Sequence, residues 1–261
     1  SIVNRVWHHH FGRGLVDSPN DFGRMGGTPS HPELLDWLAV RFRDGGGSFK
    51  ALHRLIVTSA VYRQSTRHHP DHATVDAGNA LLWRMNRLRL DAESVRDAIL
   101  QITGTLDSAM GGPSVMQFHF VDPDPNRTPT VDYARFDVDS PAARRRSVYR
   151  YIFRSLADPF MDCLDCADAS QLTPVRNTSV TALQAMAMFN DRFIVRYSEH
   201  AAAKVKGAGD TAAQVDAVCE LALGRLPREA ERARYAAYAA RHGMANLCRL
   251  ILNSNEFMFL D

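Results

Sequence analysis

Apolar residues recur every three or four positions along most of the chain, which is the spacing of one face of an α-helix. After Pro32 this spacing continues up to the glycines 45–47, and it resumes after Ser48, a residue type that commonly caps helices. The short glycine turn predicts an antiparallel pair of helices over Pro32–Ala60. Its buried residues are expected to be Leu35, Leu38, Leu52 and Ile56.

Helical spacing also dominates the second half of the chain. Asp91 is well placed to cap a helix that carries Val95 and Ile99 on one face. Gly224 follows the helix predicted over Thr211–Leu223 and suits the left-handed backbone conformation that ends many helices. Further helices are predicted within 179–205, from Pro227 onward and over 244–252.

One segment, Asp107–Pro141, breaks the helical pattern. It is rich in proline and aspartate, and a loop of this length in a compact domain is usually functional or unstructured. Apolar and polar residues alternate over Met116–Phe120, and Val148–Phe153 shows the same alternation. Because alternation is typical of half-buried strands, these two stretches predict a small antiparallel ribbon.

Together these elements predict a mainly α fold. We expect one compact helical domain over residues 1–261, with a small antiparallel β-ribbon and a long Pro/Asp-rich loop. A subdivision into 1–106 and 142–261, around the loop 107–141, is the alternative. An apolar content of 45% over 261 residues is enough to form a sizeable core.

The charge balance excludes one class of partner. With 31 basic and 29 acidic residues, the net charge is +2, whereas proteins that bind nucleic acid usually carry a strongly basic face. No apolar run reaches the roughly 18 residues that a membrane-spanning helix needs. The first residues are typical of the middle of an amphipathic segment and not of a signal peptide. We therefore expect the C-terminal part of a longer protein, with no nucleic-acid partner and no membrane span.

Two of the four cysteines stand three positions apart. Cys163 and Cys166 have the spacing of a metal knuckle, a redox pair or a haem-attachment motif. Haem attachment requires a histidine where this chain has Ala167, so haem is not expected to bind to this chain. A disulfide, a redox-inert pair and a metal site remain alternatives for the two cysteines.

The segment Asn4–Val16 holds the densest group of candidate site residues. It carries the histidines 8–10 between Trp7 and Phe11, and imidazole is both the commonest metal ligand and the group that titrates nearest neutral pH. His9 and His10 are candidates for catalysis. The alternative is that they are buried histidines that bond to carbonyl groups, because no known spacing of metal ligands is present.

Two aspartates further along the chain complete this candidate site. Asp165 and Asp168 are candidate catalytic carboxylates, and Asp165 is expected to join His9 and His10 as a ligand of a divalent metal. Asn4–Val16 is accordingly predicted to lie beside Asp162–Arg176. The physical reason is that the donors of one segment and the carboxylates of the other are costly to bury alone.

Three further residues are candidates for ligand binding. Arg13 stands between two glycines and can contact an external anion or a carboxylate of the protein itself. His31 is a further imidazole that can join the histidine cluster. Trp7 can stack on a sugar ring, although aromatic residues at helical spacing more often lie in the core.

Several motifs follow one another along the chain. They are NRVWHHHFGRGLV (Asn4–Val16), TPSHPELLDWLA (Thr28–Ala39), KALHRLIVTSAVYRQS (Lys50–Ser65), LLWRMNRLRLDAE (Leu81–Glu93), MGGPSV (Met110–Val115), RRSVYR (Arg145–Arg150) and LNSNEF (Leu252–Phe257). Together they resemble domain of unknown function 1553, a C-terminal domain of planctomycete surface proteins whose upstream domains often include c-type haem modules. The resemblance covers nearly the whole chain. It implies an exported, cell-envelope location and a link with electron transfer or polymer degradation.

Two positions depart from the family's pattern. The family segment reads Phe-Asp-Ala-Pro-Asp where this chain has Leu164–Asp168, so the aspartates match and Cys166 does not. His8 stands where glutamine is usual, whereas His9 and His10 match. A family-wide role of the histidines therefore falls on His9 and His10, and the cysteine pair is expected to be a feature of a subgroup.

Three functions are compatible with the sequence. The first is a helical accessory or interaction domain of an exported, haem-module-associated surface protein, which docks on upstream domains of the same polypeptide. The second is an enzyme that acts on an extracellular polysaccharide or a similar polymer, with His9, His10 and an aspartate of Asp165–Asp168 at its centre. The third is a metal- or redox-linked partner of a cytochrome c domain, which would use Cys163 and Cys166. The first is preferred because it requires no feature that the sequence lacks.

Overall fold

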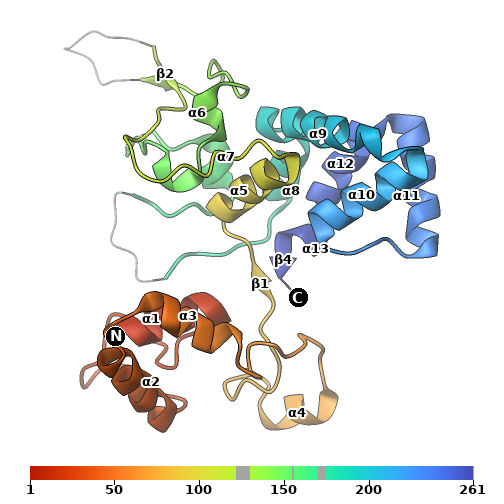
Figure 1. The fold of residues 1–261 in the computed structure, drawn as a ribbon. Helices are drawn as coiled ribbons and strands as arrows, with labels where there is room; N and C mark the ends of the chain where they lie inside the picture. The colour runs from red at the N-terminus through yellow and green to blue at the C-terminus, as the bar shows by residue number, and fades with distance from the viewer. Residues whose placement is uncertain (122–129, 155, 170–174, 261) are drawn as a thin grey trace. The chain divides into compact units, whose positions relative to one another are not determined.

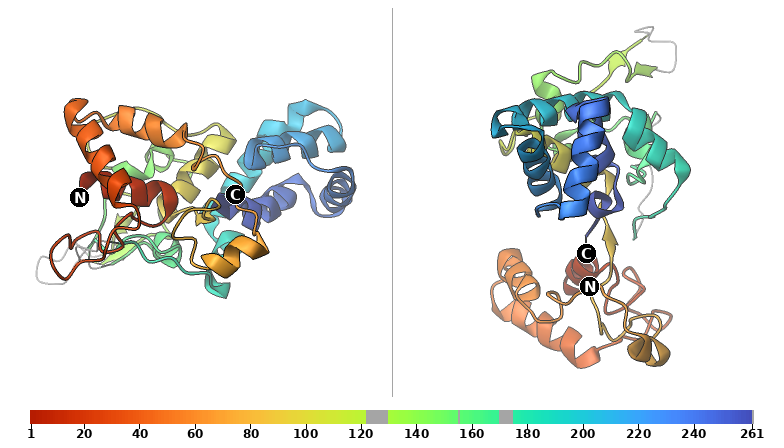
Figure 2. Two further views of the ribbon diagram at one scale, coloured as in Figure 1. Left: turned by 90° about the horizontal axis from the view of Figure 1, so that it is seen from below. Right: turned by 90° about the vertical axis from the view of Figure 1, so that its right-hand side faces the viewer.

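The structure, a computed structural model, describes residues 1–121, 130–154, 156–169 and 175–260. The chain forms two compact units (Figures 1 and 2). The first unit consists of Ser1–Leu88 and the C-terminal residues from Phe259, and the second is Arg89–Met258. Two short strands, β1 (Leu88–Arg89) and β4 (Phe259–Leu260), pair where the chain passes from one unit to the other.

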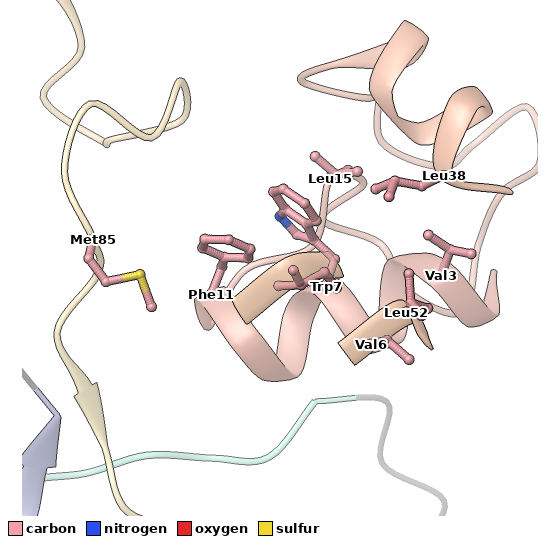
Figure 3. Close-up of a cluster of buried hydrophobic side chains, with 9 residues drawn as sticks. Val3, Val6, Trp7, Phe11, Leu15, Leu38, Leu52 and Met85 are labelled. Carbon is pink, nitrogen blue, oxygen red and sulfur yellow. The ribbon is translucent and has the colours of Figure 1, made fainter. Parts of the chain in front are cut away.

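The first unit is built on its N-terminal helix. Helices α2 and α3 both pack against α1, and the buried face of α1 carries Trp7 and Phe11, whose ring centroids lie 4.2 Å apart (Figure 3). The four helices of the unit are α1 (Ile2–Phe11), α2 (Pro32–Asp44), α3 (Phe49–Val57) and α4 (Pro70–Val75). The core buries Val3, Val6, Trp7, Phe11, Leu15, Leu38, Leu52, Ile56 and Met85.

A buried amide holds the segment that follows α1. The Asn4 side chain is fully buried; its Nδ2 donates to the carbonyl of Val16 at 3.0 Å, and its Oδ1 accepts from the Val16 amide at 2.9 Å. Gly12 adopts a left-handed conformation that ends α1. A Cβ on Gly14 would lie only 2.8 Å from Asn4 Nδ2. Gly12 and Gly14, which flank Arg13, are therefore explained by the backbone conformation of this turn.

The second unit contains the remaining helices. They are α5 (Ala92–Thr103), α6 (Pro141–Arg144), α7 (Pro159–Cys163), α8 (Ala182–Asn190), α9 (Arg192–Val205), α10 (Thr211–Leu223), α11 (Glu229–His242), α12 (Met244–Leu252) and α13 (Asn255–Met258), with 3-10 turns η1 (Ser147–Tyr149) and η2 (Lys206–Ala208). Helix α9 is central, because α5, α8, α10 and α12 all pack against it (Figures 1 and 2). The core around α9, α10 and α12 buries Ala201, Val205, Val215, Val218, Cys219, Leu247, Cys248 and Ile251.

The mainly α fold is confirmed, and so are its main sequence signals. The caps form as predicted: Ser48 accepts from Ala51 N, and Asp91 accepts from Ser94 N at 2.7 Å. Leu38, Leu52 and Ile56 are buried as predicted, whereas Leu35 is only partly buried at the edge of the same cluster.

The predicted pairing of the β-ribbon is wrong. Strand β2 (His119–Phe120) pairs antiparallel with β3 (Val131–Asp132) and not with Val148–Phe153. The Asp97 carboxylate accepts from the backbone amide and the hydroxyl of Ser147, where the 3-10 turn of residues 147–149 begins. This turn takes the residues out of the extended conformation, and Arg150 then makes an isolated parallel bridge with Val115.

The long loop lies inside the second unit and does not separate the units. They divide at Leu88 and Arg89, and not around 107–141; whether they act as one domain stays a prediction. The described part of the loop is tied to α9, because Asp139 accepts from His200 and from Arg196, each at 2.7 Å. The aspartates and prolines of residues 122–129 lie outside the described residues.

In the described part of the chain, no helix has the length and apolar character needed to cross a bilayer.

Gly224 allows a test of how much the left-handed backbone conformation at the end of α10 requires glycine. It adopts the predicted left-handed conformation after α10, with φ 67°, and no described neighbouring atom lies within 4 Å of the position that a Cβ would take. Gly224→Ala should therefore lower the free energy of unfolding by about 1 kcal/mol through backbone strain alone. Urea denaturation followed by circular dichroism measures it. Gly207→Ala is the matched control, because Gly207 has equally open surroundings and no positive φ; equal effects of the two changes would contradict the explanation.

Candidate binding cleft

The second unit contains two adjoining cavities that form one cleft. The larger has a volume of about 210 Å³ and the smaller a volume of about 90 Å³. Both are lined by Tyr133, Arg150, Asp158 and Met161, so these residues lie at the junction. Every described lining residue of either cavity belongs to the second unit.

A buried ion pair occupies the junction. Arg150 donates through Nη2 to Asp158 and through Nε to Gln117 Oε1 at 2.7 Å. Asp158 in turn caps α7, because its Oδ1 accepts from the amides of Phe160 and Met161. The two side chains are only 9% and 21% exposed. The local sequence explains the placement, since Asp158-Pro159 is a typical helix start.

Arg96 of α5 lies against the larger cavity as a second buried guanidinium. It donates to the carbonyls of Ala143 and Arg145 and to the hydroxyl of Ser147. Burial, together with the positive charge of Arg150, lowers the pKa of Arg96 to about 10. The side chain therefore stays charged at neutral pH, and its hydrogen bonds hold the segment 143–147 against α5.

The larger cavity combines aromatic walls with charged groups at the start of α9. Asp191 caps α9 by accepting from the Phe193 amide at 2.8 Å. Burial raises the pKa of the Asp191 carboxyl, and the nearby charge of Asp158 raises it further. Arg192 donates to the carbonyl of Ala134. The aromatic side chains of the wall are Tyr133, Phe136, Phe160 and Phe193.

The smaller cavity lies beside a cluster of aromatic rings. The ring of Phe118 has centroid distances of 5.5 Å to Tyr133, 5.9 Å to Tyr151 and 5.8 Å to Phe153. The latter three rings line the cavity, whose carboxylates are Asp158, Asp162 and Asp168. The Tyr133 hydroxyl donates to the carbonyl of Leu156 at 2.7 Å, which fixes this ring across the junction.

Comparison with known proteins identifies the family. A model described as PSD1, protein of unknown function (DUF1553), matches residues 1–239, a span that includes every described lining residue of the cleft. The chain belongs to this family. No curated protein and no solved structure matches the chain.

The predicted site residues of this DUF1553 chain divide between the two units. His9, His10, Arg13, His31 and Trp7 belong to the first unit, and the predicted aspartates and cysteines belong to the second. That Asn4–Val16 lies beside Asp162–Arg176 therefore stays a prediction, and residues 170–174 lie outside the described residues.

For the candidate site residues of the first unit, the described side-chain contacts are with other residues of that unit. His10 Nε2 lies 2.7 Å from His53 Nδ1, while His9 is exposed. Arg13 forms an ion pair with Asp17, in keeping with the second of its two predicted roles. His31 Nδ1 lies 2.9 Å from the Ser30 hydroxyl at the start of α2. Trp7, only 5% exposed, lies in the core.

Asp165, one of the predicted carboxylates, accepts several hydrogen bonds. It accepts from the amide and hydroxyl of Ser179, from Gln184 Nε2 at 2.9 Å and from Arg89 Nη1 at 3.2 Å. Burial by itself would raise the pKa of Asp165, but these hydrogen bonds and the charge of Arg89 lower it overall. Its contacts all lie within the second unit. Asp168 lines the smaller cavity.

Cys163 and Cys166, which stand three positions apart in this DUF1553 chain, are free thiols. Burial and the charge of Asp165 raise the pKa of Cys163. Burial and the neighbouring carboxylate of Glu93 raise the pKa of Cys166 to about 11. Reactive and metal-binding cysteines act as thiolates and usually have lowered pKa values, so the surroundings of this pair disfavour the redox role.

The metal prediction concerns His9, His10 and Asp165, which belong to different units, and it stays a prediction. Within the described residues, no group of three or more histidine, cysteine, aspartate or glutamate side chains is arranged to hold a metal ion.

Of the residues that line the cleft, only Cys166 and Asp168 were candidates from the sequence, and those at the junction of the two cavities were missed. Arg150 belongs to the motif RRSVYR (Arg145–Arg150), but no pattern in the sequence predicts its partner Asp158 or the ring of Tyr133. One signal was available, because Asp158-Pro159 has the sequence of a helix start. The contact across the cleft is a tertiary feature, which no local pattern contains.

Asp165 generates a stability prediction. Asp165→Ala removes the acceptor for Ser179, Gln184 and the buried Arg89, and should lower the free energy of unfolding by about 2–4 kcal/mol. Chemical denaturation followed by circular dichroism measures the loss. The control is Asp162→Ala, an exposed aspartate on α7; a comparable loss there would contradict the assigned role of Asp165.

The same carboxylate predicts a pH dependence. Because the folded-state pKa of Asp165 lies below its ordinary value of 3.8, its contribution is present above about pH 4 and is lost as the pH falls through the folded-state value. Asp165→Asn keeps a side chain that tolerates the left-handed backbone of this position (φ 61°). The variant should therefore lose less stability than the wild type between pH 5 and pH 3, and an equal loss would refute the prediction.

The first unit should respond to mild acid. Burial lowers the pKa of His10, and the neighbouring His53 and His9 lower it further. The stability that this neutral imidazole contributes is present above about pH 6.5 and is lost as the pH falls through the lower folded-state value. All three tryptophans lie in the first unit, so tryptophan fluorescence in urea reports on it. The unfolding midpoint should fall between pH 7.5 and 5.5, and fall less in His10→Gln than in the wild type.

Proposed function

We propose that the chain is a helical accessory domain of an exported, haem-module-associated surface protein, and that it binds a ligand in the cleft of its second unit. The observation that carries the binding role is the pair of adjoining cavities that share Arg150 and Asp158. Ligand pockets are typically concave and largely apolar, with a few well-placed polar groups. The cleft has this composition, because aromatic walls surround a small set of charged side chains.

The polar groups of the cleft favour binding over proton transfer. Arg150 is held by Asp158 and Gln117, Asp191 caps α9, and Arg192 contacts the carbonyl of Ala134. Side chains fixed in this way need little reorganisation when a ligand enters. The pKa of about 11 at Cys166, which lines the smaller cavity, is unsuited to a nucleophile at neutral pH.

Export, the cell-envelope location and the haem-bearing partners rest on the family resemblance. In this proposal the upstream domains of the same polypeptide are the docking partners, and the c-type haem modules belong to those domains. The cleft would then hold an extracellular ligand close to the haem modules. A polysaccharide segment is compatible with this role, since aromatic walls suit the apolar faces of sugar rings.

The two alternative functions receive less support. An enzyme centred on His9, His10 and Asp165 requires Asp165 to face a substrate, yet its oxygens accept from Ser179, Gln184 and Arg89. A redox partner based on Cys163 and Cys166 requires reactive thiolates, and the pKa values of both thiols are raised. A ligand-binding accessory domain requires neither feature.

The binding role is tested by blocking the cavities. Ala134 lines the larger cavity and Ala157 the smaller, and both are exposed, so tryptophan at either position should fill space without disrupting the core. Cellobiose, glucuronate and choline serve as neutral, anionic and cationic probes in titrations of the full chain, followed by NMR. At least one probe should shift resonances of cleft residues, and Ala134→Trp or Ala157→Trp should weaken its binding at least ten-fold.

Ala240→Trp is the matched control, because Ala240 is exposed on α11 and belongs to neither cavity. It should leave probe binding unchanged. Failure of all three probes to bind at millimolar concentration, or binding that the two cavity-filling variants do not affect, would refute the proposed function.

A further inference from the structure

We propose that the smaller cavity of the cleft binds an alkylated ammonium group, such as the trimethylammonium head of choline. The inference rests on the proposed function, because it assigns a ligand class to one part of the same cleft. It is carried by the combination of three aromatic rings and an excess of carboxylates around a small cavity.

The aromatic rings provide the first argument. Tyr133, Tyr151 and Phe153 line the cavity, and their packing around Phe118 leaves Tyr151 45% exposed. The faces of aromatic rings are electron-rich and attract cations, and cages of such rings are a recurrent way of binding quaternary ammonium groups. Aromatic side chains therefore offer an alkylated cation both dispersion contacts and electrostatic attraction.

The charge of the lining provides the second argument. Among the described residues of the smaller cavity, three carboxylates (Asp158, Asp162, Asp168) stand against two guanidinium groups (Arg150, Arg154). Arg150, which is 9% exposed, and Asp158 neutralise each other in an ion pair. The other charged groups of the lining are Asp162 and Asp168 against Arg154. The balance is reversed in the larger cavity, where Arg96, Arg150 and Arg192 stand against Asp158 and Asp191.

This difference between the cavities determines which sign of ligand charge the smaller cavity favours. A carboxylate or phosphate in the smaller cavity would be repelled by the excess of acidic groups. A compact primary ammonium group is strongly hydrated and would lose much of that hydration beside aromatic walls. Methyl groups spread the charge and weaken the hydration, so an alkylated ammonium group suits both the rings and the carboxylates.

The volume of the cavity provides the third argument. About 90 Å³ is less than half of the volume of the larger cavity, so the space suits a small head group. The remainder of such a ligand would continue past Tyr133 and Met161 into the larger cavity, which adjoins the smaller one along these residues. The surplus of guanidinium groups there is suited to an anionic group of the same ligand.

Choline and its neutral isostere 3,3-dimethylbutan-1-ol provide the test, because the two molecules have nearly the same shape and differ in charge. Titrations of the full chain are followed by NMR. Choline should shift resonances of Tyr151, Phe153 and Asp162, and the isostere should bind at least ten-fold more weakly. Equal binding of the two would overturn the proposal, since it would show an apolar pocket without preference for a cation.

Two substitutions distinguish the contribution of the aromatic ring of Tyr151 to choline binding from that of the carboxylate charge of Asp162. Tyr151→Ala removes an exposed ring and Asp162→Asn removes an exposed charge without changing the shape of the side chain. Tyr151→Ala should weaken choline binding about three- to thirty-fold, the range that corresponds to the strength of a cation–π contact. Asp162→Asn should also weaken it, because a carboxylate that attracts the cation is lost. Asp36→Asn, the same change at an exposed position of the first unit, should leave choline binding unchanged.

The outcomes also separate this inference from the proposed function. If choline fails to bind while cellobiose or glucuronate binds in the cleft, the ammonium site is refuted and the binding role stands. If none of the probes binds, both are refuted. Choline binding that neither Tyr151→Ala nor Asp162→Asn weakens would place the cation elsewhere and overturn the proposal.

Discussion

The short helix α7 is the element on which the cleft depends, and an aspartate holds it at each end. Asp158 caps its first turn and pairs with Arg150, while Asp165 follows its last turn and accepts from Ser179, Gln184 and Arg89. A five-residue helix has little stability of its own. The two carboxylates supply the tertiary bonds that an isolated segment of this length lacks. Because α7 lines both cavities, the shape of the cleft follows from these two residues.

Asp165 also shows how a strained backbone is maintained. Its φ of 61° lies in the left-handed region, which costs a non-glycine residue roughly 1 kcal/mol, although aspartate tolerates it better than most residues. The hydrogen bonds to charged and polar partners outweigh that cost. The carboxylate that follows α7 thereby accepts from the backbone amide and the hydroxyl of Ser179. These bonds give Asp165 a structural role, and its candidacy for catalysis stays a prediction.

The histidine-rich start of the chain has a comparable explanation within its own unit. Helix α1 buries Trp7, Phe11 and the amide of Asn4, so one face of the helix is occupied by the core. His10 lies on another side, where it meets His53 of α3. Adjacent imidazoles on one helix must point in different directions. The roles of His9 and His10 in catalysis or metal binding stay predictions.

The sequence by itself determined the helical class and the ends of several helices, because those features depend on neighbouring residues. Ser48 and Asp91 cap the predicted helices, and Gly224 adopts the predicted left-handed conformation. The order of motifs also identified the family. Only the tertiary structure decided the strand pairing and the cleft. His119 pairs with Asp132. Arg150, which follows the turn that Asp97 stabilises, pairs with Asp158. Such contacts join residues whose separation along the chain carries no periodic signal, and their energy depends on the burial that the whole unit creates.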